Sequence, residues 1–145
     1  MKKMTTLILS LALLAIMLVG CSKEADAPKS DADLLKLAAE AAKWIAENPD
    51  ADQAALQELC DKLGVDDVCF VDANGVIALS NEADVVGYDL NNDEQSQAFL
   101  PLLSGDLSEL VQEPTARGVD GETWQFAAVS GGLEGGLTQI GMKVE

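Results

Sequence analysis

The chain has 145 residues and a strong excess of acid, with 25 Asp and Glu against 9 Lys and Arg and a formal net charge of −16 at pH 7. A field of this sign repels phosphate backbones and argues against a nucleic-acid partner. The sequence contains no His, so the most common general base and metal ligand are both missing.

The first twenty residues have the pattern of an export signal. Two lysines precede an apolar run over 7–19, which is too short for a comfortable membrane span. The segment ends in Leu18-Val19-Gly20-Cys21, which resembles the lipobox of bacterial lipoproteins. The resemblance implies that 1–20 is a lipoprotein signal peptide and that a lipid on Cys21 holds the protein on the extracytoplasmic face of the cell membrane. The alternative is an ordinary signal peptide, or a membrane anchor with an incidental Cys.

Two helices are predicted at the start of the domain. Residues 21–30 are small and polar and include a Pro, as in a flexible tether, and 31–145 has the length of one domain. Ser30 is a suitable N-cap for a helix whose apolar residues recur at helical spacing up to Asn48-Pro49. A second helix begins at Asp50 or Asp52 and ends at Gly64.

A β-hairpin is predicted over 68–80. Its arms are rich in β-branched residues. Between them lies Asn74-Gly75, which favours a tight type I′ turn. Both arms are largely apolar, a pattern typical of strands covered on both faces. Such strands usually lie in the middle of a sheet, so we expect this hairpin at the centre of the fold.

A helical connector and three further strands are predicted after the hairpin. The connector begins at Asn81 and continues into a short helix, which Asn91-Asn92-Asp93 caps and Pro101 kinks or ends. Strands are expected over 107–112, 123–130 and 137–144, with a loop over 113–121. Trp124, Phe126, Ala128 and Ser130 would share one face of their strand. Helices segregated from an antiparallel sheet indicate an α+β fold.

This order of elements resembles the Cache domains, the extracytoplasmic relatives of PAS domains that serve as sensory input modules. The resemblance spans residues 63–142 and rests on Leu63-Gly64-Val65-Asp66, the hairpin Phe70–Ile77 with Ser80, Gly87-Tyr88-Asp89-Leu90, Gln95-Ser96 with Phe99, Leu110–Pro114, Phe126–Val129 and Gly135–Gly141. It implies a five-stranded antiparallel sheet, a long N-terminal helix on one face and a helical connector between strands 2 and 3. It also implies a small ligand, often an amino acid or a carboxylate, between the connector and the other face.

The ligand-binding residues are expected around the connector and the 123–130 strand. Arg117 is the only Arg, and its guanidinium suits a carboxylate, although a surface Arg paired with an acid is the more common outcome. Pockets favour aromatic walls with a few polar groups. Candidates for these roles are Tyr88, Phe99, Trp124 and Phe126 as walls, and Gln112 and Ser130 as hydrogen-bonding groups. Core packing alone would explain Phe99 and Phe126.

Two cysteines remain outside the lipobox, Cys60 and Cys69. In an exported protein they could form a disulfide, and the short link between them permits one. The alternative is two buried thiols, and the sequence leaves both open. Their spacing fits no zinc or redox motif, so we expect neither a metal nor a cofactor.

The sequence therefore favours a binding module over an enzyme. No Ser-His-Asp set, Cys-His pair or phosphate-binding loop is found. Because no kinase, cyclase or second membrane segment follows the domain, we expect any signal to pass through a partner, such as a membrane signalling protein. The alternative function is a structural or protein-interaction lipoprotein without a ligand.

Overall fold

The computed structural model describes residues 29–145. The predicted signal peptide, Cys21 and most of the predicted tether lie outside these residues. The elements, in chain order, are α1 (Asp31–Glu47), α2 (Gln53–Leu63), β1 (Asp67–Val71), β2 (Ile77–Ser80), η1 (Ala83–Val85), η2 (Leu90–Asn92), α3 (Glu94–Gln97), α4 (Pro101–Ser104), β3 (Glu109–Val111), β4 (Thr115–Ala116), β5 (Thr123–Ser130) and β6 (Leu137–Lys143).

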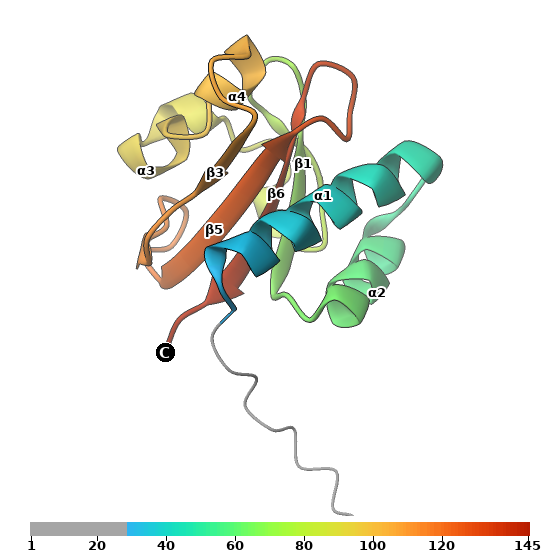
Figure 1. Ribbon diagram of the computed structural model, residues 1–145, viewed down its shortest axis with the longest axis horizontal. Coiled ribbons are helices and arrows are strands. Elements are labelled where there is room, and N and C mark those ends of the chain that lie inside the picture. The colour runs from blue at the N-terminus through green and yellow to red at the C-terminus, as the bar shows by residue number, and fades with distance from the viewer. Residues whose placement is uncertain (1–28) are drawn as a thin grey trace, which may run out of the picture.

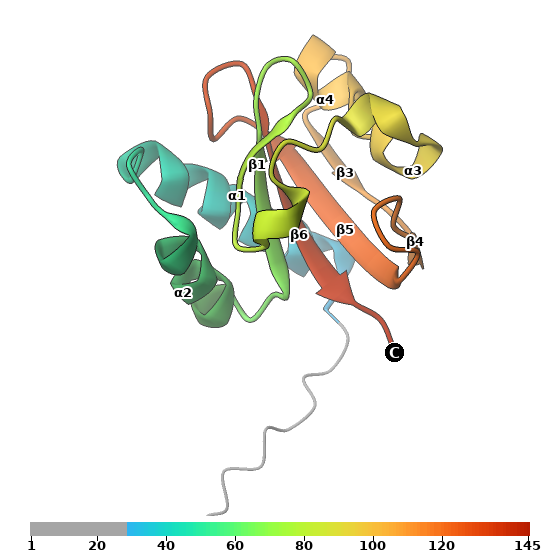
Figure 2. The ribbon, with the colours of Figure 1, turned by 180° about the vertical axis from the view of Figure 1, so that it is seen from behind.

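One antiparallel sheet carries the fold, with helices on both of its faces. Its strand order is β2-β1-β6-β5-β3, and the two-residue β4 also pairs with β5. In Figure 1, α1 crosses the near face of the sheet and α2 lies beside β1. Figure 2 shows the connector, with α3 and α4, on the opposite face. The predicted order of helices, hairpin, helical connector and later strands is confirmed.

The predicted hairpin forms, but it does not lie at the centre of the sheet. β6 is the middle strand, β1 is its neighbour and β2 is an edge strand. All five residues of β1 are buried, because α2 packs on one face and the connector covers the other. The apolar pattern therefore indicates that both faces of the strand are covered. The prediction that the hairpin lies at the centre was wrong.

The turn of the hairpin also differs from the prediction. A type I′ turn needs positive φ at both central residues, and no residue other than glycine has positive φ among the described residues. The Asp72 carboxylate instead accepts from the backbone N–H groups of Asn74 and Val76. Within this turn only Gly75 has a left-handed backbone, with φ 84°. A side-chain acceptor thus stabilises a wider loop in place of the two-residue turn.

The two predicted N-terminal helices form with the expected caps. The Ser30 hydroxyl accepts from the Asp33 N–H, while the Asp33 carboxylate accepts from the Ser30 N–H, which makes a capping box. The Asp52 carboxylate caps α2 in the same way. Both helices turn their apolar sides to the sheet, where they form one buried cluster of Leu34, Ala38, Ala41, Ile45, Leu56, Leu59, Cys60, Val65, Val68, Phe70, Ala127 and Ile140.

A second buried cluster lies between the other face of the sheet and the connector. It contains Cys69, Val71, Ile77, Val85, Leu90, Phe99, Leu102, Trp124, Phe126, Ala128 and Leu137. Successive residues of a strand point to opposite faces, so Trp124, Phe126 and Ala128 share this side as predicted. Pro101 begins α4, where its missing N–H costs nothing.

The backbone of the connector is hydrogen-bonded to the beginning of β2 along its outer edge. The N–H of Ile77 donates to the carbonyl of Tyr88, and the N–H of Gly87 donates to the carbonyl of Ile77. A third bond runs from the N–H of Leu90 to the carbonyl of Gly75. These bonds fix the position of Tyr88 relative to the sheet.

The sheet separates the two cysteines. Cys60 belongs to the cluster under α1 and α2, whereas Cys69 belongs to the cluster under the connector. Both are free and buried. Of the two alternatives that the sequence left open, the structure has the pair of buried thiols and no disulfide between them.

The later strands were predicted less evenly than the helices. β5 has the predicted bounds, and β6 ends one residue earlier than expected. β3 is shorter than the predicted 107–112 strand, and β4 lies within the segment expected to be a loop. Within residues 29–145, no helix combines the length and apolarity needed to cross a membrane.

Candidate functional site

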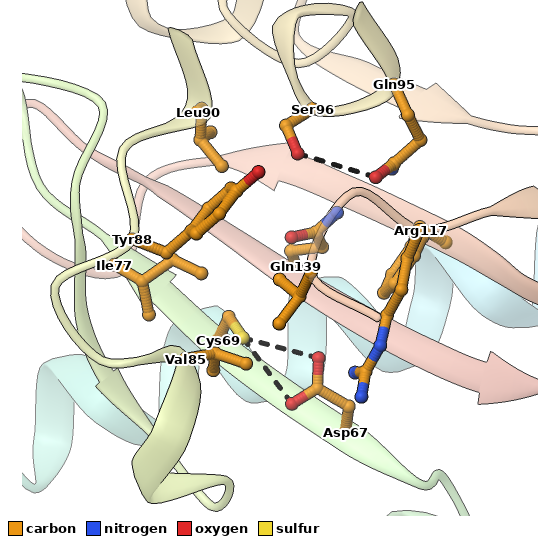
Figure 3. Close-up of a pocket in the computed structure, with 12 residues that line it drawn as sticks. Asp67, Cys69, Ile77, Val85, Tyr88, Leu90, Gln95, Ser96, Arg117 and Gln139 are labelled. Atoms are coloured by element: carbon orange, nitrogen blue, oxygen red, sulfur yellow. Dashed lines mark hydrogen bonds between the residues drawn. The ribbon is translucent and has the colours of Figure 1, made fainter. Parts of the chain in front are cut away.

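A small cavity lies between the connector and the sheet (Figure 3). Its volume is about 30 Å³, which is room for a few water-sized groups. Ligand pockets typically measure about 300–1,000 Å³, so the free space here is far smaller than that of a ligand pocket. The lining residues are Asp67, Cys69, Ile77, Val85, Tyr88, Leu90, Gln95, Ser96, Arg117, Val119, Phe126 and Gln139.

Strand register brings the floor of the cavity together. Cys69 of β1 is paired directly with Gln139 of β6, and Asp67 is paired with Gly141. The side chains of alternate residues therefore reach the cavity face. Gly141 leaves room for the aromatic residues of β5, because a Cβ there would lie 2.7 Å from a ring carbon of Phe126. The floor thus depends on pairing between segments about seventy residues apart.

Asp67 is a buried carboxylate facing this cavity. It is 2% exposed and accepts from the Cys69 thiol at 3.3 and 3.4 Å and from the Ser80 hydroxyl at 3.3 Å. Burial raises the pKa of Asp67 to about 6, since desolvation disfavours the charged form. Burial and the charge of Asp67 in turn raise the pKa of the Cys69 thiol, so this thiol is protonated and unreactive at neutral pH.

Arg117 reaches over the cavity from the loop after β4 and is held by two carboxylates. Its Nη1 donates to Glu82 at 3.0 Å, and its Nη2 donates to Asp120 at 2.6 Å. Its Nε also donates to Asp120. Burial opposes the charge, but these partners outweigh it and raise the pKa of Arg117. The guanidinium also lies 4.3 Å from the centre of the Trp124 ring, which adds a cation–π contact.

Tyr88 forms a wall of the cavity and is fixed by an acid on the connector. Its hydroxyl donates to the Asp93 carboxylate. Burial and this bond raise the pKa of Tyr88 to about 12. Burial opposes the charge of Asp93, but hydrogen bonds from Tyr88 and Ser96 hold the pKa of Asp93 below its usual value. Asp93 also caps α3, so the same carboxylate positions Tyr88 and the helix that carries Ser96.

Gln139 and Gln95 both bring amide groups to the cavity, but only the amide of Gln95 is hydrogen-bonded within the described residues. The Gln95 amide is engaged: it donates to the Gln112 side chain and accepts from the Gly118 N–H. Gln139 is 5% exposed, and no hydrogen bond of its side chain is found among the described residues. In Figure 3 its amide points into the cavity.

The structure brings three of the predicted site residues to the cavity, namely Tyr88, Arg117 and Phe126. Their role in binding stays a prediction. Trp124 lies just outside the cavity, stacked on Phe126 at 5.9 Å and covered by Arg117, and its buried Nε1 has no hydrogen-bond partner. Phe99 is buried behind Phe126, with ring centres 6.4 Å apart.

The two predicted hydrogen-bonding residues do not line the cavity. Gln112 is hydrogen-bonded to Gln95 and so helps to position a residue that lines the cavity. The Ser130 hydroxyl donates to the carbonyls of Leu102 and Leu107, which ties the end of β5 to α4 and to the segment that follows it.

Sequence reasoning missed the polar floor of the cavity, made by Asp67, Cys69 and Gln139. One signal was present for Asp67: it is an acid at the start of a strand whose other residues are apolar. No such signal marks Gln139. Within residues 29–145 no group of three or more Cys, Asp or Glu is placed to hold a metal ion.

The comparisons with known proteins support the fold. No family model matches the chain, and no curated protein matches it. Among solved structures, an extracellular ligand binding receptor from Desulfohalobium retbaense DSM5692 is 18% identical with a TM-score of 0.58 over 77% of this chain. The sensor domain of DcuS from E. coli is 16% identical with a TM-score of 0.53 over 78% of this chain.

The two matches differ in how much of the other protein is covered. This chain spans 22% of the Desulfohalobium receptor and 90% of the DcuS sensor domain. At these identities the likeness concerns the fold, and it confirms the predicted α+β fold of the PAS and Cache type.

Proposed function

We propose that this chain is a lipid-anchored, extracytoplasmic module that binds a small molecule and acts through a partner protein. The observation that carries the proposal is the cavity between the connector and the sheet, lined by buried polar groups and aromatic rings. The two solved structures reported above are described as a ligand binding receptor and a sensor domain, which supports a sensory role over an enzymatic one.

A ligand of amino-acid or carboxylate size needs this cavity to open. The volume of about 30 Å³ admits only one end of such a molecule. Opening would separate the connector from the loop that carries Arg117. Two contacts join these segments over the cavity: the Arg117–Glu82 ion pair and the hydrogen bond from the Gly118 N–H to the Gln95 side chain. Binding would therefore be coupled to movement of these two segments, which is how a bound ligand would be communicated to a partner.

The anchor and location belong to the same proposal. They rest on the Leu18-Val19-Gly20-Cys21 motif after a short apolar run. A lipid on Cys21 and a tether over 21–30 would hold the domain close to the membrane, within reach of a membrane signalling protein. The partner would read the state of the connector or of α1.

A second candidate is a structural or protein-interaction lipoprotein. The small volume of the cavity favours it, because a fold that has lost its ligand would fill the space. The two functions differ in one measurable respect: only a sensory module changes its stability or mass with a small molecule.

A thermal-shift screen with amino acids and short carboxylates tests the proposal, followed by native mass spectrometry of the protein purified from its own host. We expect at least one compound to raise the melting temperature in a concentration-dependent way. If no compound does so and the native mass is that of the protein alone, the second candidate replaces the first.

A further inference from the structure

The cavity lining holds one carboxylate, Asp67, and one cation, Arg117. Arg117 is the one cation in its lining, and the ion pairs with Glu82 and Asp120 already compensate its charge. Asp67 forms no ion pair with any Lys or Arg of the described residues. When Asp67 is ionised, the cavity therefore holds a carboxylate without a cation in contact with it.

The hydrogen bonds of Asp67 satisfy it only weakly. Its donors are a thiol at 3.3 and 3.4 Å and a hydroxyl at 3.3 Å. A carboxylate has about four acceptor positions and prefers donors within about 3 Å. A buried carboxylate with weak donors gains strongly from a cation that also donates hydrogen bonds.

A second acceptor faces the same space. Gln139 is 5% exposed, points into the cavity and has no hydrogen-bond partner for its side chain among residues 29–145. Its carbonyl can accept from a ligand. The rings of Tyr88 and Phe126 also line the cavity, and aromatic faces attract cations.

We propose that the cavity binds the ammonium group of a small primary amine, with Asp67 as its counter-charge and Gln139 as a second acceptor. An ammonium group has three or more donors and no acceptor, which matches two acceptors and lacks any group that they would repel. It is also the size of a water molecule, as the cavity requires. The inference rests on the proposed function, since it names the ligand group for the same site.

The inference replaces the expected contact between Arg117 and a ligand carboxylate with a contact between Asp67 and a ligand ammonium group. A ligand carboxylate could reach Arg117 only by displacing Glu82 or Asp120, and Asp67 would repel it. An amine needs no displacement of an existing partner. An amino acid would satisfy the site through its ammonium end.

Binding should weaken in acid, because only the ionised form of Asp67 compensates the ligand's charge. Its pKa is about 6, so affinity falls about tenfold for each pH unit below that value. The titratable or charged groups acting on Asp67 are Cys69 on its own strand, Glu82 before η1, Arg117 after β4 and Cys60 on α2.

The test uses the full chain in detergent micelles, with methylammonium chloride as the probe. Sodium chloride at equal ionic strength controls for screening, and sodium acetate and glycine represent the other ligand classes. Binding is followed by thermal shift and by calorimetry at pH 7.5 and pH 5. The variants are Asp67→Asn, Gln139→Leu and, as a control for the loss of one charge, Asp84→Asn, whose residue is exposed on η1. Circular dichroism establishes that each variant is folded.

We expect methylammonium to bind the wild type and Asp84→Asn, to bind at least tenfold more weakly to Asp67→Asn and at pH 5, and to bind more weakly to Gln139→Leu. Equal binding to Asp67→Asn and wild type overturns the inference. Binding of acetate without methylammonium also overturns it and leaves the proposed function standing. If no class of compound binds, both the inference and the proposed function fail.

Discussion

At Asp67, the burial of a carboxylate links the stability of the fold to pH. The pKa of this group is about 6 in the folded chain and near 3.8 when it is exposed. Between these values the folded chain binds a proton that the unfolded chain does not. The contribution of Asp67 to the free energy of unfolding therefore falls as pH rises from about 4 to about 6, by an amount of the order of 3 kcal/mol.

Replacing Asp67 by Asn should remove this dependence, because the amide keeps the shape and carries no charge. We expect the stability of the variant relative to wild type to improve by about 3 kcal/mol between pH 4 and pH 7. Urea denaturation at several pH values measures the difference directly. If the free energy of unfolding depends on pH in the same way in both proteins, Asp67 is hydrated in solution.

Arg117 joins three segments through its side chain, which is 10% exposed. Arg117→Ala leaves Glu82 and Asp120 without their cation and uncovers Trp124, so we expect a loss of about 1–3 kcal/mol in the free energy of unfolding. The free energy of unfolding of Arg117→Lys should lie between those of wild type and Arg117→Ala, because Lys keeps the charge without the planar fork of donors.

Lys43→Ala is the control for Arg117→Ala. It removes an ion pair with Glu47 whose side chains are 78% and 64% exposed, which is worth about 0–0.5 kcal/mol. Chemical denaturation of the three variants gives the comparison. If Arg117→Ala is as stable as Lys43→Ala, the contacts over the cavity do not hold it closed.

Among the elements, β6 shows how a small residue in a strand permits an aromatic pair on the next strand. A Cβ at Gly141 would lie 2.7 Å from Phe126 and 3.1 Å from Trp124. We expect Gly141→Ala to cost about 1–3 kcal/mol through overpacking and to change the tryptophan fluorescence. In a Phe126→Leu background the cost should be smaller, because the opposing ring is gone. If Gly141→Ala lowers the free energy of unfolding equally in both backgrounds, the strain does not come from the Phe126 ring.

The helices and long strands could be predicted from sequence because their signals are local. Ser30 with Asp33, and Gly64 at the end of α2, mark helix ends within a few residues. The hairpin turn was mistaken because the Asp72 side chain competes for the backbone donors. β4 has two residues, which is too few for a periodic pattern.

The floor of the candidate site could not be predicted in the same way. Asp67 and Gln139 share one face because β1 pairs with β6 in one register, and a slip of one strand by one residue would turn its side chain to the other face. Arg117 was found by its rarity, yet its partner Glu82 comes from a segment 35 residues earlier. Long-range pairing decides which acids surround the only arginine.

At the scale of the whole molecule, the prediction that a lipid anchors the chain can be tested without reference to the ligand. We expect wild-type protein expressed in bacteria to incorporate a labelled palmitate analogue and to partition into a detergent phase, and Cys21→Ala to lose both properties. Cys60→Ala, which removes a buried thiol, is the control and should keep the label. Labelled Cys21→Ala would refute the lipobox interpretation.

The hydrogen bonds between the connector and the outer edge of β2 also affect self-association. An edge strand with free donors and acceptors is a template on which another chain can extend the sheet. Here the backbone around Tyr88 already occupies the outer N–H and carbonyl of Ile77, where β2 begins, and the carbonyl of Gly75 before it. Lifting the connector, as a large ligand would require, exposes them. A chain held open in this way would be the form prone to polymerise by strand addition, and a bound ligand that lets the connector return would prevent it.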